Sequence, residues 1–376
     1  MAPSQALEGL LQERLDRAVR DDPAVHGGVL RVDLPGFAWQ GAAGLADPAA
    51  GVAMRPEDQF QAASITKMLT ATTFMTLVEA GAAGLDAPLG RYLPAALTEG
   101  LHDCQGRAWG PELTPRQLLS HTSGIADFFG DGAPGAGGVL PFVAQMQADP
   151  DRLWDPRDML AWTRANLRPH FAPGHGWHYA DTGYVLVGLI IEAVTGQALH
   201  DAMRERVLAP LGMAHSYMLF REAARPSLPG RGPSVAHAGA ATYGTARSVS
   251  ADWGGGGLVV TAADLARFMR AFAADRIFRD PASRRQMLTW TATGEPGVDY
   301  GLGVRRFALA ELGLPGFGEL YGHTGFLKSF MLYWPAGDAV ISGTLNQSAA
   351  AGAFSRLRPV AALVPAVLRD LRTAAG

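Results

Sequence analysis

Lysine is almost absent from this sequence. The chain has 376 residues and 32 lysines and arginines together, yet only Lys67 and Lys328 are lysines. A guanidinium group hardly ever gives up its proton, whereas a buried lysine can. A lysine kept in such a chain therefore suggests chemistry that arginine cannot perform. Lys328 follows the last of the motifs described below, and we expect it to be a solvated charge at the end of a strand.

Several other features are scarce or missing. Cys104 is the one cysteine, so a disulfide within the chain is excluded. No run of 18 apolar residues predicts a transmembrane helix. The first twenty residues are typical of a charged amphipathic helix rather than a signal peptide, so we expect a cytoplasmic protein. A formal net charge of −3 gives no electrostatic basis for binding nucleic acid or a membrane.

Two catalytic signatures are missing as well. The chain contains neither the Gly-x-Ser-x-Gly elbow of α/β-hydrolases nor the His-Glu-x-x-His motif of zinc enzymes. His170, His175 and His178 crowd one segment, but their pattern does not predict a metal site. The run Gly254–Gly257 lacks the context of a nucleotide loop, and we expect conformational freedom near a cleft there. We therefore predict neither a metal nor a cofactor.

The pattern of expected elements indicates an α/β (α+β) architecture. Strand-like segments cluster near both ends of the chain, and helical periodicity dominates the middle. We therefore expect a discontinuous α/β lobe, residues 1–75 and 255–376, with a helical lobe, residues 76–254, inserted into it to make one catalytic domain. The expected strands are 28–32, 37–40, 301–306, 329–334 and 338–345, and the expected helices are 5–20, 64–80, 156–167, 182–195, 198–207, 261–272 and 352–372.

The first candidate motif is Ser64-x-x-Lys67, at the start of an expected helix. A spacing of three places both side chains on one helix face, near the positive end of the helix dipole. That field favours an oxyanion and a lowered lysine pKa, and a neutral lysine amine can take the proton of a serine hydroxyl. A capping serine followed by a snorkelling lysine would explain the same residues without catalysis.

The second motif is Tyr179-x-Asp181, directly before another helical pattern. A tyrosine beside a lysine can share a proton with it and serve as a general acid or base. An aromatic anchor followed by an aspartate N-cap is the alternative without catalysis.

The third motif, His323-Thr324-Gly325-Phe326, precedes an expected strand. A strand beside an active serine can pair with an extended substrate and lend an N–H group to an oxyanion hole. A turn would explain the same residues without a role in binding.

In this order the three motifs resemble those of the penicillin-recognising serine hydrolases. The branch of class C β-lactamases, D-alanyl-D-alanine carboxypeptidases, D-aminopeptidases, D-amino-acid amidases and family VIII esterases is the most similar. The similarity includes segments 60–67, 118–125, 181–184, 256–265 and 300–303. It implies a β-lactamase/DD-peptidase-like fold, with an antiparallel sheet flanked by helices.

The same resemblance implies roles for the motif residues. Ser64 would be the nucleophile, Lys67 the base and Tyr179 a proton relay, and the Ser64 N–H would contribute to the oxyanion hole. Asp181 and the third motif would contact the substrate, with His323 lining its cleft.

Two residues depart from the family pattern. Asp181 stands where the family usually has asparagine, and a carboxylate accepts hydrogen bonds but donates none. Beside Lys67 it would favour the ammonium form and oppose the base role, or it would bind an amine of the substrate. His323 stands where most β-lactamases have lysine, and it is a weaker anchor for a carboxylate. This difference favours esters or amides over β-lactams.

We therefore expect a serine hydrolase that works through an acyl-enzyme on small amides or esters, including D-amino-acid amides or peptides. A carboxylesterase, a β-lactamase and an acyltransferase are the alternatives on the same scaffold. A non-catalytic binding or scaffold protein is the alternative from another class, and the intact Ser64, Lys67 and Tyr179 speak against it. The expected partner is a small-molecule or short-peptide substrate, with no nucleic acid and no membrane.

Overall fold

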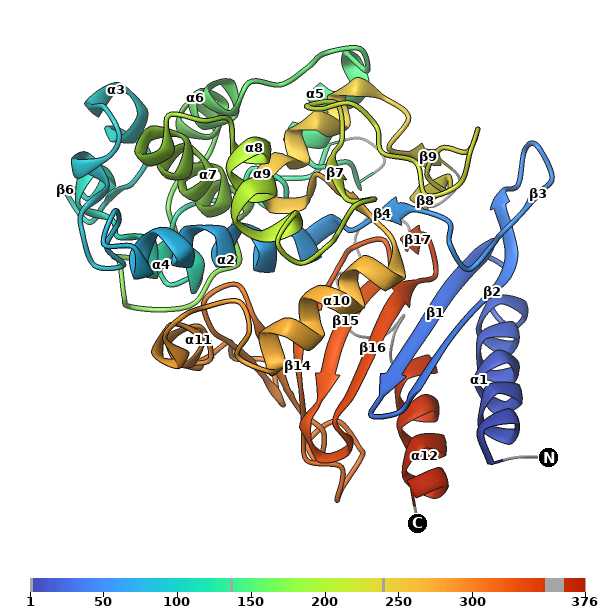
Figure 1. Cartoon of the computed structure of the whole chain (residues 1–376). Helices are drawn as coiled ribbons and strands as arrows, with labels where there is room; N and C mark the ends of the chain where they lie inside the picture. Colours follow the sequence, from blue (N-terminus) through green and yellow to red (C-terminus); the bar gives the residue numbers. More distant parts are fainter. Residues whose placement is uncertain (1–2, 136–137, 239–240, 349–361, 376) are drawn as a thin grey trace.

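A mixed set of strands and helices forms the protein, described by a computed structural model for residues 3–135, 138–238, 241–348 and 362–375. In this part of the chain nine strands form one sheet, in the order β11-β12-β13-β14-β15-β16-β1-β2-β3 (Figure 1). Neighbouring strands are antiparallel throughout. The strands are β1 (Gly27–Leu34), β2 (Phe37–Asp47), β3 (Val52–Ala53), β11 (Thr291–Ala292), β12 (Val298–Tyr300), β13 (Arg305–Ala308), β14 (Glu319–Thr324), β15 (Ser329–Trp334) and β16 (Ala339–Thr344).

A hairpin joins the first two expected strands, 28–32 and 37–40. Leu34 of β1 lies opposite Phe37 of β2, and Gly36, after Pro35 in the turn between them, has a φ of 75°, as the second central residue of a type II turn requires. β1 also pairs with β16, with Val29 opposite Thr344. Both ends of the chain therefore build the sheet, as the clustering of strand-like segments predicted.

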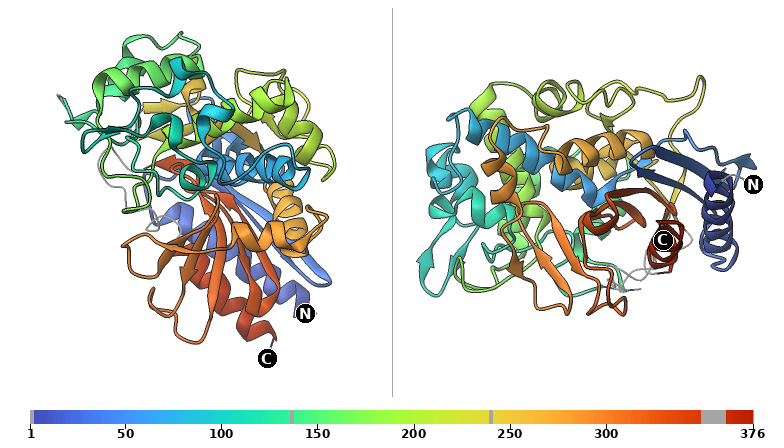
Figure 2. Two further views of the ribbon diagram at one scale, coloured as in Figure 1. Left: turned by 90° about the vertical axis from the view of Figure 1, so that its left-hand side faces the viewer. Right: turned by 60° about the horizontal axis from the view of Figure 1, so that its bottom comes forward.

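Helices cover both faces of this sheet (Figures 1 and 2). On one face α1 (Pro3–Arg20) and α12 (Leu363–Ala375) pack against the strand side chains that point to that face, such as the buried Leu332. On the other face the neighbouring Met331 belongs to a core that includes α10 (Ala262–Ala273). Successive strand residues point to opposite faces, so apolar strands such as β15 need cover on both sides. The first part of the helix expected at 352–372 lies outside the described residues.

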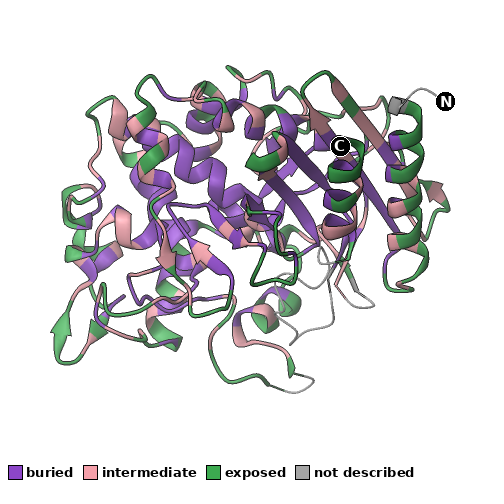
Figure 3. Cartoon of the chain, turned by 90° about the horizontal axis from the view of Figure 1, so that it is seen from below, coloured by how far each residue is buried: buried purple, intermediate pink, exposed green. Residues whose placement is uncertain are grey.

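Helices make up most of the regular structure between β3 and β11, and most residues of α2 (Thr66–Glu79) and α7 (Asp181–Thr195) are buried. Figure 3 shows the buried parts of helices and strands in purple. The assignment of residues 76–254 to a separate lobe stays a prediction. Besides α10, the α-helices here are α2 (Thr66–Glu79), α3 (Ala95–Thr98), α4 (Pro115–Leu119), α5 (Pro141–Ala148), α6 (Pro156–Asn166), α7 (Asp181–Thr195), α8 (Leu199–Met203), α9 (Trp253–Gly256) and α11 (Pro281–Met287). Short strands form smaller sheets, namely β4 (Phe60–Gln61), β10 (Leu258–Val260) and β7 (Tyr217–Met218), then β17 (Gln347–Ser348), β8 (Ala236–Ala238) and β9 (Ala241–Tyr243), then β5 (Asp103–Cys104) and β6 (Arg107–Ala108).

Within the described ranges, no single helix is both long and apolar enough to cross a membrane. One pair of helices, Asp181–Thr195 and Leu199–Leu208, has the length and composition of a membrane span only when the two are taken together, and the chain bends by 80° between them.

Lys328 corrects one expectation. It lies in the turn between β14 and β15 with a φ of 56°, and only 7% of its surface is exposed. Its Nζ donates to the Asp22 carboxylate at 2.9 Å, and this hydrogen bond lowers the pKa of Asp22. The solvated charge expected from the sequence is therefore wrong, because Asp22, some 306 positions earlier in the chain, meets the ammonium in the fold.

Candidate active site

Ser64 lies in a single 3₁₀ turn, Ala63–Ile65, that leads directly into α2. Strand β4 before this turn pairs with β10, and the Ala62 N–H donates to the Leu258 carbonyl at 2.8 Å. Ala63 has a φ of 48°, a left-handed conformation that costs an alanine about 1–2 kcal/mol. The surrounding pairing holds this strained turn and leaves Ser64 half-buried at the start of α2.

Lys67 is fully buried beside Ser64. Its Nζ lies 3.3 Å from Ser64 Oγ, donates to the Gly255 carbonyl at 2.9 Å and forms an ion pair with Asp181 Oδ1. Burial lowers the pKa of Lys67, but the negative charge of Asp181 and the interaction with Tyr179 outweigh burial and raise this pKa above its usual range. The lowered lysine pKa expected from the helix dipole is therefore wrong, because the surroundings of Lys67 favour its ammonium form.

Asp181 faces Lys67 instead of capping its own helix. The N-cap of α7 is Ala180, and Asp181 is the first residue inside the helix. Its backbone N–H donates to Asp127 Oδ1 at 3.0 Å, and its side chain, which is 14% exposed, pairs with Lys67. The N-cap interpretation is therefore wrong, and the first two motifs meet through this ion pair.

The glycine run from Gly254 to Gly257 lets the backbone lie close to the Lys67–Asp181 ion pair. A Cβ atom at Gly255 would lie 2.5 Å from Asp181 Oδ1 and 3.4 Å from Lys67 Nζ. The Gly254 carbonyl accepts a hydrogen bond from Thr70 of α2 at 2.7 Å. Sequence reasoning missed this contribution, because it is made by backbone carbonyls that carry no side-chain signal.

Tyr179 brings its ring over the same ammonium. Lys67 Nζ lies 4.9 Å from the ring centroid, and the guanidinium carbon of Arg305 lies 5.4 Å from it. The rings of His121 and Tyr300 pack beside it, with centroids 4.3 and 6.3 Å away. Arg305 and Tyr300 come from β13 and β12, and no local pattern in the sequence linked them to the second motif.

The third motif lies against the turn that carries the serine. The Ser329 hydroxyl donates to the Ala62 carbonyl at 2.7 Å. A Cβ atom at Gly325 would lie 2.6 Å from that carbonyl oxygen and 2.9 Å from the Ala63 Cβ, so the contact requires glycine. The structure therefore places the end of β14 and the start of β15 beside the serine turn.

His323 lies in β14, and its side chain is fully buried. Its Nδ1 lies 2.8 Å from the Thr324 carbonyl oxygen, and its Nε2 lies 2.9 Å from the Tyr300 hydroxyl. Both ring nitrogens thus have partners inside the protein. Phe326, in contrast, is 43% exposed, and its ring contacts Tyr243 with centroids 5.3 Å apart.

Two further carboxyl groups surround the Lys67–Asp181 pair. Burial and the nearby charge of Asp181 raise the pKa of Asp127 well above its usual range. Burial also raises the pKa of Asp252 to about 7, although the Tyr243 hydroxyl donates to it at 2.8 Å. Lys67 therefore pairs with Asp181, and Asp127 and Asp252 hold protons far more readily than exposed carboxyls do. Sequence reasoning missed Asp252 entirely.

Comparison with known proteins defines the class. The family model described as Beta-lactamase matches residues 15–366. The chain is 31% identical to Penicillin-binding protein 4 of Amycolatopsis lactamdurans, over 91% of this chain and 86% of the relative. It is 30% identical to Esterase EstB of Burkholderia gladioli, over 86% and 87% of the two chains. The fold and these relatives define a serine hydrolase.

Solved structures agree with this class. The D-amino acid amidase of Ochrobactrum anthropi SV3 superposes with a TM-score of 0.78 at 26% identity, over 99% of this chain and 100% of that one. A D-stereospecific amidohydrolase from Streptomyces sp. gives 0.73 at 27% identity, over 91% and 94%. The chain belongs to the beta-lactamase family, and the antiparallel sheet with flanking helices expected from the motifs is confirmed.

Proposed function

We propose that Ser64 attacks the carbonyl carbon of a small amide or ester and forms an acyl-enzyme, which water then hydrolyses. The observation that carries this proposal is the 3.3 Å approach of Lys67 Nζ to a half-buried Ser64 Oγ, with the ammonium also held by Asp181 and Gly255. An ammonium with three N–H donors and these acceptors has a single well-defined position. It therefore orients the serine hydroxyl and stabilises negative charge that develops on its oxygen.

Tyr179 moves the proton in this scheme. As Ser64 Oγ bonds to the carbonyl carbon, the Tyr179 hydroxyl proton moves to the departing nitrogen or oxygen, and the phenol oxygen takes up the serine proton, so the tyrosine ends the step neutral. The two cations beside its ring, Lys67 and Arg305, stabilise negative charge on the phenol oxygen during the transfer. In the second half the same relay runs from water to Ser64. The Ser64 N–H contributes to the oxyanion hole.

Small amides of D-amino acids, or short D-peptides, are the substrates that we propose. The likeness to the D-amino acid amidase and to the D-stereospecific amidohydrolase over nearly the whole chain supports this choice. The third motif supports it too, since His323 is buried and satisfied within the protein and offers no exposed cation to a substrate carboxylate. Ester hydrolysis is the second candidate, favoured by the relative EstB.

A panel of chromogenic substrates tests this function. We expect turnover of D-amino-acid p-nitroanilides or amides, weaker turnover of their L counterparts, measurable p-nitrophenyl ester hydrolysis and the slowest turnover of nitrocefin. A hydroxyl-positioning ammonium serves both amides and esters, whereas nitrocefin carries a carboxylate that His323 is not placed to bind. Initial rates with purified enzyme measure the order. Nitrocefin as the best substrate would contradict the proposal.

The protonation state of Lys67 has its own test, the variant Asp181→Asn. The carboxylate raises the Lys67 pKa, so its removal lowers that pKa. If Lys67 works as an ammonium, activity is lost as pH rises through its pKa, and the alkaline limb of the pH profile moves to lower pH for every substrate. If Lys67 works as a neutral base, the acidic limb moves to lower pH instead. We expect the first result.

The same measurement separates the other roles of Asp181. If it binds a substrate amine, only amine-bearing substrates lose activity, by about 1.5–3 kcal/mol of transition-state stabilisation. A matched control is Asp155→Asn, which removes a carboxylate from the exposed N-cap of α6, where asparagine caps as well as aspartate. Its pH profile should match the wild type. An unchanged profile in Asp181→Asn would exclude both functional roles of this residue.

A further inference from the structure

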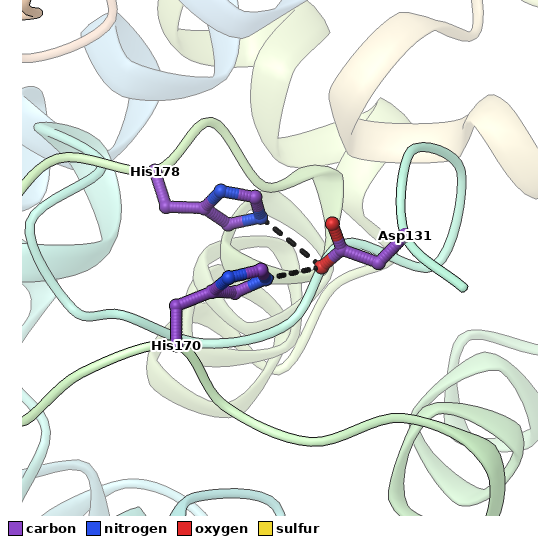
Figure 4. Close-up of side chains that lie close together, drawn as sticks. All are labelled: Asp131, His170 and His178. Carbon is purple, nitrogen blue, oxygen red and sulfur yellow. Dashed lines mark hydrogen bonds and ion pairs between the residues drawn. The ribbon is translucent and has the colours of Figure 1, made fainter. Parts of the chain in front are cut away.

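Asp131, His170 and His178 form a cluster outside the catalytic residues proposed above (Figure 4). Asp131 lies in the segment between α4 and α5, and both histidines lie in the segment between α6 and α7. Their side chains converge, with His170 Nε2 at 2.7 Å and His178 Nε2 at 3.1 Å from the same oxygen, Asp131 Oδ2. Two segments far apart in sequence therefore meet through three groups that commonly bind metals.

The geometry of the cluster fits a small divalent cation. The ligand atoms of all three residues lie within 4.8 Å of one another, and the two imidazole rings stack with centroids 3.6 Å apart. Zinc bonds of about 2.0–2.1 Å in a tetrahedron place neighbouring ligand atoms roughly 3.3 Å apart. Admitting an ion thus requires Asp131 Oδ2, now 2.7 and 3.1 Å from the two Nε2 atoms, to move out to that separation, and the two stacked rings to turn so that both Nε2 atoms face the ion.

The charges in the cluster also favour a cation. Asp131 Oδ2 accepts hydrogen bonds from both imidazoles and, at 2.7 Å, from the Asp127 N–H, so a carboxylate oxygen lies where the two Nε2 atoms converge. A carboxylate is ordinarily ionised at neutral pH and can supply a negative charge to a bound cation. Each neutral imidazole can bind an ion through Nε2 once its ring proton has moved to Nδ1. The side chains of His170 and His178 are 38% and 24% exposed, so a water molecule can complete the coordination.

We propose that Asp131, His170 and His178 bind one divalent first-row transition ion, with Zn²⁺ the best match to two imidazoles, one carboxylate and one water. Zn²⁺ has no geometric preference from its d electrons and accepts this mixed nitrogen and oxygen set. The site is separate from the acyl-enzyme chemistry, which needs no metal.

The ion would act on the catalytic residues through positioning. His178 directly precedes Tyr179, so fixing its imidazole restrains the backbone that carries the tyrosine. Asp131 accepts a hydrogen bond from the backbone N–H of Asp127. The Asp127 carboxylate in turn accepts one from the backbone N–H of Asp181 at 3.0 Å. The bound ion would therefore tie together the two segments that place the second motif.

Binding of Zn²⁺ and Co²⁺ to the purified, tag-free full chain tests this site. We expect one Zn²⁺ per chain in competition with a chromophoric chelator, and visible absorption typical of tetrahedral Co²⁺. Outer-shell changes alone weaken metal sites about 10–100-fold, so loss of a ligand in His170→Ala or Asp131→Asn should weaken Zn²⁺ binding at least about tenfold and abolish the Co²⁺ spectrum.

Two controls match these variants. His175→Ala removes an exposed histidine from the same segment, and His237→Ala breaks another histidine pair, His26–His237, with rings 4.4 Å apart. Both should bind Zn²⁺ as the wild type does. Zn²⁺ should raise the unfolding temperature of the wild type and not that of His170→Ala. Substrate hydrolysis by His170→Ala in the presence of a metal chelator shows that this variant is folded. The absence of one-to-one binding by the wild type, or equal Zn²⁺ affinity in His170→Ala and wild type, would overturn the proposal.

Discussion

Replacing Ser64 by alanine is expected to abolish covalent labelling by a fluorophosphonate and to lower kcat/KM by about 10³-fold or more. The substitution removes only the hydroxyl group, whose oxygen lies 3.3 Å from Lys67 Nζ. The strained turn around it depends on backbone pairing with β10 and not on the hydroxyl, so the variant should fold. Intact-mass analysis and peptide mapping of labelled protein measure the result.

Ser227→Ala is a matched control for this experiment. Ser227 is half-buried and donates its hydroxyl to the Glu57 carbonyl, away from Lys67. This variant should be labelled at Ser64 and keep wild-type turnover. Labelling that persists in Ser64→Ala, on Ser123 for example, would refute the assignment of the nucleophile.

Changing Lys67 to arginine is expected to be nearly as damaging as changing it to alanine, with a loss of about 10²–10⁴-fold in kcat/KM. Nζ is fully buried between Ser64, Asp181 and Gly255. A planar guanidinium is larger than an ammonium and cannot place one donor on each of these acceptors. Pre-steady-state acylation and kcat/KM of both variants measure the effect.

The second lysine supplies the control. Lys328→Arg keeps a charge that pairs with Asp22 and does not contact Ser64, so its activity should stay close to the wild type. Near wild-type acylation by Lys67→Arg would mean that a positive charge alone suffices at this position. In that case the fixed geometry of the ammonium would not matter for catalysis.

Local patterns were enough to predict much of the fold. The expected strands at 329–334 and 338–345 correspond to β15 and β16, and the expected helix at 156–167 to α6, because period-two and helical periodicities survive in the sequence wherever one face must be buried. The first four residues of the strand expected at 301–306 form no strand, and only residues 305 and 306 belong to one. β12 ends at Tyr300 and β13 begins at Arg305, since a turn with Gly303 at a φ of 76° separates them.

The sequence by itself determined the family, the three motifs and the meeting of Ser64 with Lys67, because those two residues are one helical turn apart and need no distant contact. The tertiary structure alone decided the charge state of Lys67. Its pKa depends on burial and on Asp181, which lies 114 positions away and contributes a charge at contact distance. The tertiary structure also decided that His170 and His178 converge on Asp131, since no spacing in the chain records which carboxylate a folded loop will meet.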